Sequence, residues 1–325
     1  MGSCHGTSLR GGSGPPGKPG APAAVASDFN LGYNDDVMER SASETAALVE
    51  RLLSFSLPDG GLPYYRGNAS SAEPTLLAAL ALFASGLPAD RAEPFLAWAQ
   101  KIQNPDGSVG VDPGHRDQGV WLTAQAAIAF HYYGLKENLT RARGFLLSLR
   151  SVTIPKDPRL KQDNTLTGWP WVPGTFGWVE PTAWSLIALS LSGLGGHPRA
   201  EEGARFLLDR QIPSGGWNYG NPALDGKELL PFWDTTGLAL VALHGHGDPK
   251  RIGASLELME KNQGKIESLS GLSWAVLGLQ GYGRDAGRSR VKLLNVMGSL
   301  RDEEFHAGNF ALGLIALSGK KVFIP

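Results

Sequence analysis

The sequence predicts an all-α protein, an α/α toroid in which six helical hairpins close into a double-layered ring. Short apolar runs recur along the chain, and five of them end at a glycine 13 positions after their first residue. No alternation of apolar and polar residues indicates a strand pattern. A repeat period of roughly 35 to 60 residues is typical of stacked supersecondary units. The fold class therefore follows from the repeat.

The apolar runs predict the six inner helices. Each begins at an acidic or capping residue and stops at a glycine, which is one helix and its C-terminal stop. The helix at 238–243 is apolar nearly all round, as expected for a helix that is buried on both sides. The runs lie at 73–86, 121–134, 180–193, 234–247, 270–283 and, less regularly, 310–319.

An amphipathic segment with charges on one face precedes each inner run and predicts an outer helix. A glycine-rich turn or a longer loop joins the two helices of most pairs. The outer segments lie at 44–55, 92–102, 143–150, 202–210, 256–261 and 291–300. In a closed ring the six inner helices run parallel, so their N-termini meet at one end. We expect the functional opening at that end.

Composition limits the class of protein. The chain has 325 residues, 42% of them apolar, with 30 basic and 31 acidic side chains. This balance gives no basic surface for nucleic acid, so no nucleic-acid partner is expected. No apolar stretch reaches the roughly 18 residues of a membrane span, and no signal-peptide core precedes the repeats. We therefore expect a cytoplasmic protein.

One folded domain, preceded by a disordered segment, is expected. Residues 1–40 begin with a stretch rich in Gly, Pro and Ser and are predicted to be a disordered N-terminal segment. Residues 41–325 are predicted to form the single toroid. The one cysteine, Cys4, lies outside the toroid, which excludes a disulfide framework and a zinc site with a cysteine ligand.

One segment carries a family motif. Gln211, Gly215 and Trp217 follow Phe206 and Leu207 at a spacing that resembles the glutamine–tryptophan repeat of squalene-hopene and oxidosqualene cyclases, relatives of the protein prenyltransferase β subunits. A degraded copy has Gln103 but Val109 in place of the tryptophan. The resemblance extends over roughly 40–320. It implies the toroid fold and terpene cyclase chemistry. Cyclases of this kind use two toroids, which leaves open a second toroid subunit as partner.

The resemblance also implies a catalytic acid. In the cyclases an Asp-rich segment begins an inner helix, and its middle aspartate protonates the substrate. The matching segment, 232–236, keeps that residue as Asp234 and the final threonine as Thr236. Glu73 and Glu180 begin two other inner helices and are the further catalytic candidates. His306 falls at the same position if the sixth repeat is aligned by its terminal glycine.

These acids are either helix caps or catalytic groups. An acidic residue at the start of a helix is an ordinary cap that compensates the helix dipole, and the dipole favours the ionised form. An acid that protonates an alkene must instead be kept neutral by desolvation. Three acids that converge on one opening favour the catalytic interpretation.

Aromatic residues concentrate beside these acids. Six of the nine tryptophans lie between positions 169 and 233. An aromatic opening holds a prenyl chain and stabilises carbocations through ring faces, and it holds sugar rings equally well. Alternatively, the aromatic loop at 168–178 closes the end of its own ring. The predicted substrate-binding residues are Trp169, Trp171, Phe176, Trp178, Trp217, Tyr219, Phe232 and Trp233.

Three functions are compatible with these features. The first is a terpene cyclase-like protein that binds an isoprenoid or another apolar small molecule, with peripheral membrane contact and no cofactor or metal. It predicts an apolar cavity that reaches Asp234. The second is a carbohydrate-active toroid, which predicts a polar groove with two carboxylates roughly 5–9.5 Å apart. The third is a non-catalytic lipid- or protein-binding toroid, whose ring centre is filled by side chains. A zinc-dependent protein prenyltransferase is excluded because Cys4 lies outside the toroid.

Overall fold

The computed structural model describes residues 35–117 and 119–325. Most of the segment predicted to be disordered, 1–40, lies outside the described residues, and the first helix begins at Asp35. The chain from Ala42 to Pro325 forms one compact unit.

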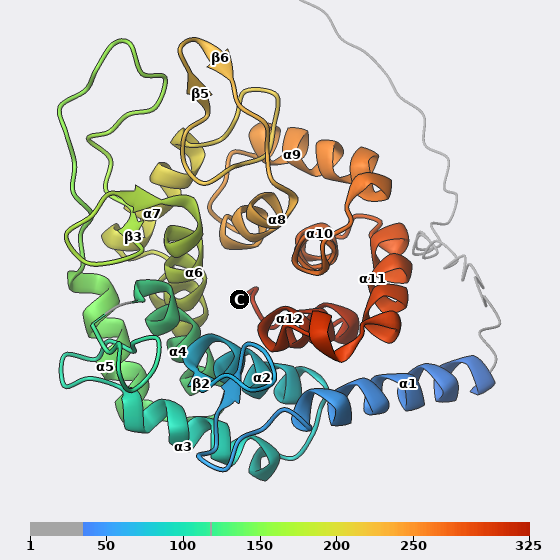
Figure 1. Cartoon of the computed structure of the whole chain (residues 1–325). Coiled ribbons are helices and arrows are strands. Elements are labelled where there is room, and N and C mark those ends of the chain that lie inside the picture. Colours follow the sequence, from blue (N-terminus) through green and yellow to red (C-terminus); the bar gives the residue numbers. More distant parts are fainter. Residues whose placement is uncertain (1–34, 118) are drawn as a thin grey trace, which may run out of the picture. The chain divides into compact units, whose positions relative to one another are not determined.

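The inner layer is a closed ring of parallel helices (Figure 1). Each inner helix packs against the next, and the last, α12, packs against the first, α2. The α/α toroid is therefore confirmed for the described part of the chain. The inner helices are α2 (Ala72–Ala84), α4 (Val120–Tyr132), α6 (Val179–Leu189), α8 (Trp233–Ala242), α10 (Leu269–Gly281) and α12 (Ala307–Ser318).

The outer layer alternates with the inner one along the chain. Several outer helices begin earlier than predicted, because their first turns are polar and carry no apolar periodicity. For example, α9 begins at Pro249, where the Asp248 side chain caps the N–H of Lys250 at 2.8 Å. The outer helices are α1 (Asp35–Leu53), α3 (Glu93–Ile102), α5 (Lys136–Ser148), α7 (Pro198–Asp209), α9 (Pro249–Asn262) and α11 (Gly287–Ser299).

Short elements complete the loops. Antiparallel two-residue strands pair β1 (Leu62–Pro63) with β2 (Ser70–Ser71), β3 (Trp169–Pro170) with β4 (Gly177–Trp178), and β5 (Ala223–Leu224) with β6 (Lys227–Glu228). Three short 3-10 helices are η1 (Ala89–Ala92), η3 (Gln263–Lys265) and η4 (Asp302–Glu304). One π turn, η2 (Ser190–Leu194), follows α6.

Left-handed glycines follow the inner helices, as predicted, with one displacement. Gly86 and Gly283, for instance, have φ values of 73° and 68°. The helix α8 ends earlier than expected, at Ala242, and its left-handed glycine is Gly245 rather than the predicted Gly247. Only a residue without a Cβ adopts this conformation at little cost.

A buried threonine joins each of four inner helices to the loop that precedes it. It is the fourth residue of its helix, and its hydroxyl accepts a backbone N–H from that loop. The four bonds run from Leu62 to Thr75 (2.8 Å), Val109 to Thr123 (2.9 Å), Trp169 to Thr182 (2.8 Å) and Trp217 to Thr236 (3.0 Å). The threonine of each acidic helix start therefore holds the loop against the ring.

The loops of successive repeats are also joined through their backbones. The first N–H of an inner helix donates to a carbonyl in a loop of the following repeat, as from Ala72 to Val111 at 2.8 Å and from Val179 to Tyr219 at 3.0 Å. The N–H of Ala307 donates to the carbonyl of Tyr64 at 2.9 Å, so an equivalent bond links the last repeat to the first. These bonds bring the helix N-termini to one end of the ring.

The glutamine–tryptophan turn is a structural joint between neighbouring hairpins. Gln211 follows α7 and donates to the carbonyl of Arg251 (2.8 Å) and the hydroxyl of Ser255 (2.7 Å) on α9. The indole N–H of Trp217 donates to the carbonyl of Leu207 at 2.7 Å. Gln103 and Gln263 make the equivalent links to the next outer helix.

Replacing Thr236 by valine removes the acceptor of the Trp217 N–H without changing the side-chain volume. We expect Thr236→Val to lower the free energy of unfolding by about 1–3 kcal/mol, because a buried N–H is left without a partner. Urea denaturation followed by circular dichroism measures it. Thr140→Val, on the exposed surface of α5, is the matched control. Equal effects of the two substitutions would contradict the proposed role of the threonine.

Candidate functional site

The N-terminal turns of the inner helices enclose a cavity of about 200 Å³. Side chains from α2, α6, α8, α10 and α12 line it, together with His306 just before α12. We call it the acidic cavity. Its lining residues are Glu73, Leu77, Glu180, Trp184, Asp234, Thr235, Leu238, Ser270, Trp274, His306, Asn309 and Leu312. The three acids that the sequence places at separate helix starts thus face one space.

The acids occupy equivalent places in the fold. Glu73, Glu180 and Asp234 are each the second residue of their inner helix. No hydrogen bond in the described part of the chain joins the Glu73 or Glu180 carboxyl to a helix N–H, whereas Asp234 accepts the N–H of Thr235 at 2.8 Å. Capping therefore does not account for the two glutamates.

Glu73 is held at both oxygens. The hydroxyl of Tyr64 donates to Oε2 at 2.8 Å, and the amide of Gln125 on α4 donates to Oε1 at 3.2 Å. Burial and the neighbouring Glu73 charge raise the pKa of Tyr64, which keeps this hydroxyl protonated as a donor. The Glu73 carboxyl is thereby held in one orientation.

Glu180 is the acid whose titration the site changes most. Burial, followed by the charges of Glu73 and Asp234, raises the pKa of Glu180 to about 8. Its side chain is half-buried, lines the cavity and makes no hydrogen bond to any described residue. Like charges and desolvation both disfavour a third carboxylate here. Glu180 therefore holds its proton at neutral pH.

His306 supplies a neutral imidazole at the rim. Its Nδ1 accepts the N–H of Asn309 at 3.1 Å and so caps α12. Burial lowers the pKa of His306, although the Glu73 charge opposes this shift. Since Nδ1 is the acceptor, the ring proton lies on Nε2. The imidazole ring lies 5.1 Å from that of Tyr64, centroid to centroid.

The floor of the cavity is aromatic. Trp184 and Trp274 each lie one helical turn below a cavity residue, Glu180 and Ser270, and their ring centroids are 5.3 Å apart. Below them lies Phe323, at 5.3 Å from Trp184 and 5.6 Å from Trp274. The four-residue spacing is the sequence signal for these floor residues, which were not predicted to bind substrate.

Phe323 belongs to the C-terminal plug, residues 320–325, which enters the ring from the end opposite the acidic cavity. Figure 1 shows the C-terminus inside the ring. The side chains of Val322, Phe323 and Ile324 are buried, and the Tyr132 hydroxyl donates to the carbonyl of Val322 at 2.7 Å. The ring centre below the cavity is therefore filled, and the apolar chamber expected of an isoprenoid cyclase is not formed there.

The eight aromatic residues predicted to bind substrate do not line the acidic cavity. Trp169 and Trp217 are fully buried, because their indoles belong to the joints between hairpins. Trp171 packs edge-on against Trp121 with centroids 4.8 Å apart, and Trp233 packs against the core. The exposed rings of Tyr219 and Phe232 contact each other, while Phe176 and Trp178 line a separate pocket.

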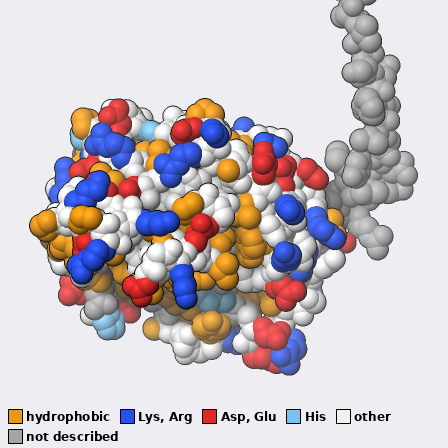
Figure 2. All heavy atoms as spheres, turned by 90° about the horizontal axis from the view of Figure 1, so that it is seen from above, with side chains coloured by type: hydrophobic (Ala, Val, Ile, Leu, Met, Phe, Trp, Pro, Cys, Tyr) orange, Lys and Arg blue, Asp and Glu red, His pale blue; other side chains and the backbone are white. Residues whose placement is uncertain are grey.

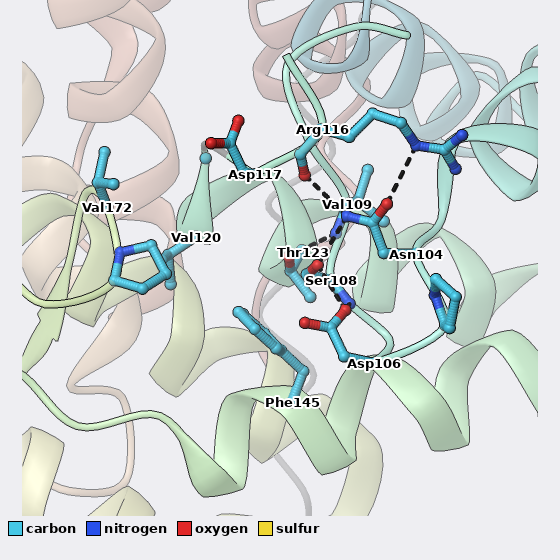
Figure 3. Close-up of a pocket in the computed structure, with 13 residues that line it drawn as sticks. Asn104, Asp106, Ser108, Val109, Arg116, Asp117, Val120, Thr123, Phe145 and Val172 are labelled. Carbon is cyan, nitrogen blue, oxygen red and sulfur yellow. Dashed lines mark hydrogen bonds between the residues drawn. The ribbon is translucent and has the colours of Figure 1, made fainter. Parts of the chain in front are cut away.

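A larger groove of about 700 Å³ lies beside the loop 104–119 (Figure 3). Its polar groups mostly bind one another. Arg116 Nε donates to Asn104 Oδ1 at 3.0 Å, and Asp106 Oδ1 accepts the N–H of Ser108 at 3.0 Å. These bonds shape the loop and leave few groups for a ligand. The acidic cavity is therefore the better candidate for a catalytic site than this groove.

Three further features concern metal-binding groups, membrane-spanning helices and surface charge in the described residues. In the part of the chain that the structure describes, no three His, Cys, Asp or Glu side chains are placed to hold a metal ion. Within those same residues no helix combines the length and apolarity needed to span a membrane. Basic and acidic side chains intermingle on the face shown in Figure 2.

Comparisons with known proteins resolve the fold but not the family. No protein-family model matches the chain, and no curated protein matches it. Among solved structures, an alpha-amylase from Clostridium perfringens is similar at 12% identity and a TM-score of 0.63, over 86% of this chain and 98% of that one. An alpha-1,6-mannanase from Salegentibacter is similar at 11% identity and a TM-score of 0.60, over 87% and 99%.

A type II terpene cyclase from Scytonema, MstE, is similar at 12% identity and a TM-score of 0.57, over 86% of this chain and 99% of that chain. At these identities the matches show the α/α toroid alone, a fold shared by terpene cyclases and carbohydrate-active enzymes.

The raised pKa of Glu180 predicts a pH-dependent stability. The unfolded chain has the ordinary value of 4.5, and the folded chain a value of about 8. The folded state therefore binds the extra proton, and its contribution to stability is full below pH 4.5 and is lost as the pH rises through 8. Glu180→Gln has no carboxyl group to titrate at this position. The difference in the free energy of unfolding, variant minus wild type, should therefore increase by about 2–4 kcal/mol when the pH is raised from 5 to 8. Urea denaturation of both proteins at several pH values measures the difference, and parallel curves would show that Glu180 is ionised in the fold.

The plug is expected to stabilise the ring. Phe323→Ala should lower the free energy of unfolding by about 3–5 kcal/mol, because it leaves a void against Trp184 and Trp274. Val291→Ala, on the exposed face of α11, is the control and should change it by less than about 0.5 kcal/mol. An unchanged melting curve for Phe323→Ala would mean that the segment does not occupy the ring centre.

Proposed function

We propose that the acidic cavity is the catalytic site of an enzyme that cleaves a glycosidic bond by general acid–base catalysis. The observation that carries the proposal is Glu180, a carboxylic acid kept protonated beside two further carboxyl groups. Pairs of acids whose surroundings separate their pKa values divide the roles of proton donor and base. Cleavage of a glycosidic bond uses two carboxyl groups in this way.

The surroundings of each acid support a different role for it in this proposal. Glu180 donates its proton to the bridging oxygen as the bond from that oxygen to the sugar carbon breaks. Asp234 accepts the Thr235 N–H at Oδ1 and makes no other hydrogen bond to a described backbone group, so Oδ2 is the oxygen that takes a proton from the attacking water. Glu73, held by Tyr64 and Gln125, maintains the charge that keeps Glu180 protonated.

The size and polarity of the cavity support a sugar as substrate. Its volume of about 200 Å³ is below the roughly 300–1,000 Å³ of pockets that hold drug-sized ligands, which suits a single ring. Hydroxyl, amide and imidazole groups of Ser270, Asn309 and His306 surround that space. An apolar chain would leave these groups and the carboxylates without water or partners, which is costly.

Acid-initiated cyclisation of an isoprenoid is the second candidate, as the sequence resemblance implies. The rings of Trp184 and Trp274 beside Glu180 favour it, because aromatic faces stabilise carbocations. The substrate would have to displace the C-terminal plug. In that reaction, too, Glu180 is the proton donor in preference to Asp234.

Activity assays separate the candidates. We expect hydrolysis of one or more members of a panel of disaccharides, with a rate that falls as the pH rises above about 8 because Glu180 loses its proton. Glu180→Gln should reduce this rate about 100- to 10,000-fold. It should reduce the rate far less on 4-nitrophenyl glycosides, whose leaving group needs no proton.

Glu257→Gln, an exposed glutamate on α9, is the matched control. Cyclised products from squalene or geranylgeranyl diphosphate, detected by mass spectrometry, would instead establish the second candidate. A folded protein that turns over neither class would be a non-catalytic toroid.

A further inference from the structure

A second pocket of about 250 Å³ lies beside the start of α6. We call it the amide pocket, because Gln162, Asn164 and Asn221 supply its polar wall. Its remaining lining residues are Val152, Ile154, Leu166, Phe176, Gly177, Trp178, Phe206, Arg210 and Gly220. A mostly apolar pocket with a few convergent polar groups is the usual form of a small-molecule site.

Gln162, in the wall of the pocket, carries a buried acceptor without a partner among the described residues. Its side chain is only 6% exposed, and its Nε2 donates to Asn221 Oδ1 at 3.2 Å. Its buried Oε1 has no partner among the described residues. Buried acceptors are nearly always paired in folded proteins. A hydroxyl or N–H group of a ligand in the pocket would complete this pairing.

The charge of the pocket is already neutralised. Arg210 forms an ion pair with Asp209 and donates to Asn164 Oδ1 at 3.1 Å, and its guanidinium lies 4.4 Å from the centre of the Phe206 ring. The positive charge of Arg210 is therefore balanced by Asp209, and three of its N–H groups bond within the protein. The preferred ligand is neutral.

The outer wall of the pocket is apolar and open to solvent. Phe176 is 50% exposed, and Val152 and Ile154 are exposed beside it. Such a wall favours a ligand with one apolar face, while Gln162 favours one with hydroxyl groups. A pyranose ring has both, with C–H groups on a face and hydroxyls at the edge. An isoprenoid chain lacks the donor.

The position of the pocket relates it to the acidic cavity. Trp178 lines the amide pocket and Glu180 lines the acidic cavity, so residues only two positions apart in the sequence, at the start of α6, belong to the two sites. We propose that the amide pocket binds a further sugar ring of the substrate, which makes that substrate an oligosaccharide. This inference rests on the proposed function above.

Binding of trisaccharides tests the inference apart from catalysis. Glu180→Gln protein, which should not turn them over, is titrated with maltotriose, cellotriose and α-1,6-mannotriose in a calorimeter. At least one should bind, and adding Phe176→Ala or Gln162→Leu should weaken binding about tenfold. Leu230→Ala, which removes a side chain that is 81% exposed and outside the pocket, should leave binding unchanged.

The outcomes for the pocket and for the cavity are distinguishable. Hydrolysis of 4-nitrophenyl glycosides needs only the acidic cavity and therefore tests the proposed function apart from the pocket. If that hydrolysis occurs but neither pocket variant alters trisaccharide binding, the pocket is not a sugar site and the proposed function stands. If trisaccharide binding depends on Phe176 but nothing is hydrolysed, the pocket stands and the proposed function fails. No trisaccharide binding at all overturns the inference.

Discussion

The closure of the inner ring is the constraint on which the rest of the structure depends. The bond from the Ala307 N–H to the Tyr64 carbonyl, with the packing of α12 on α2, joins the last repeat to the first. The alternation of outer and inner helices already makes the inner helices parallel, and closure brings their N-termini together around one space. Glu73, Glu180 and Asp234, each placed at the second residue of its helix, then share one space. In an open solenoid the same residues would form a row along an edge.

The shared space decides the chemistry of Glu180. A helix N-terminus stabilises a carboxylate by about 0.3–1 kcal/mol, less than the roughly 1.4 kcal/mol that corresponds to one pH unit of a pKa. Burial and two neighbouring carboxyl groups outweigh this effect and raise the pKa of Glu180 to about 8. The dipole argument is therefore correct in sign but too small to keep this acid ionised. An isolated helix start would lead to the opposite protonation state.

The ring divides into a polar upper part and an apolar lower part. Trp184 and Trp274 form the boundary, and Phe323 of the C-terminal plug fills the space below them. The plug covers apolar side chains of the inner helices, such as Val241 and Leu277, that would otherwise line an empty ring centre. Trp184 and Trp274 close the acidic cavity from below, and Phe323 packs against the other side of these two rings.

The sequence by itself determined the repeat, the alternation of inner and outer helices and the places of the three acids, because helix starts and stops are local features of the chain. It also indicated the joint at Gln211 and Trp217, although it did not reveal the hydrogen bonds of Thr75, Thr123, Thr182 and Thr236. Only the tertiary structure decided that Trp169 and Trp217 are buried, that Trp184 and Trp274 form the floor, and that Phe323 fills the axis. These outcomes depend on which residues distant in the chain meet when the ring closes. Local periodicity can place a residue on one face of a helix, as the four-residue spacing does for Trp184 and Trp274, but it does not show which distant residue that face meets.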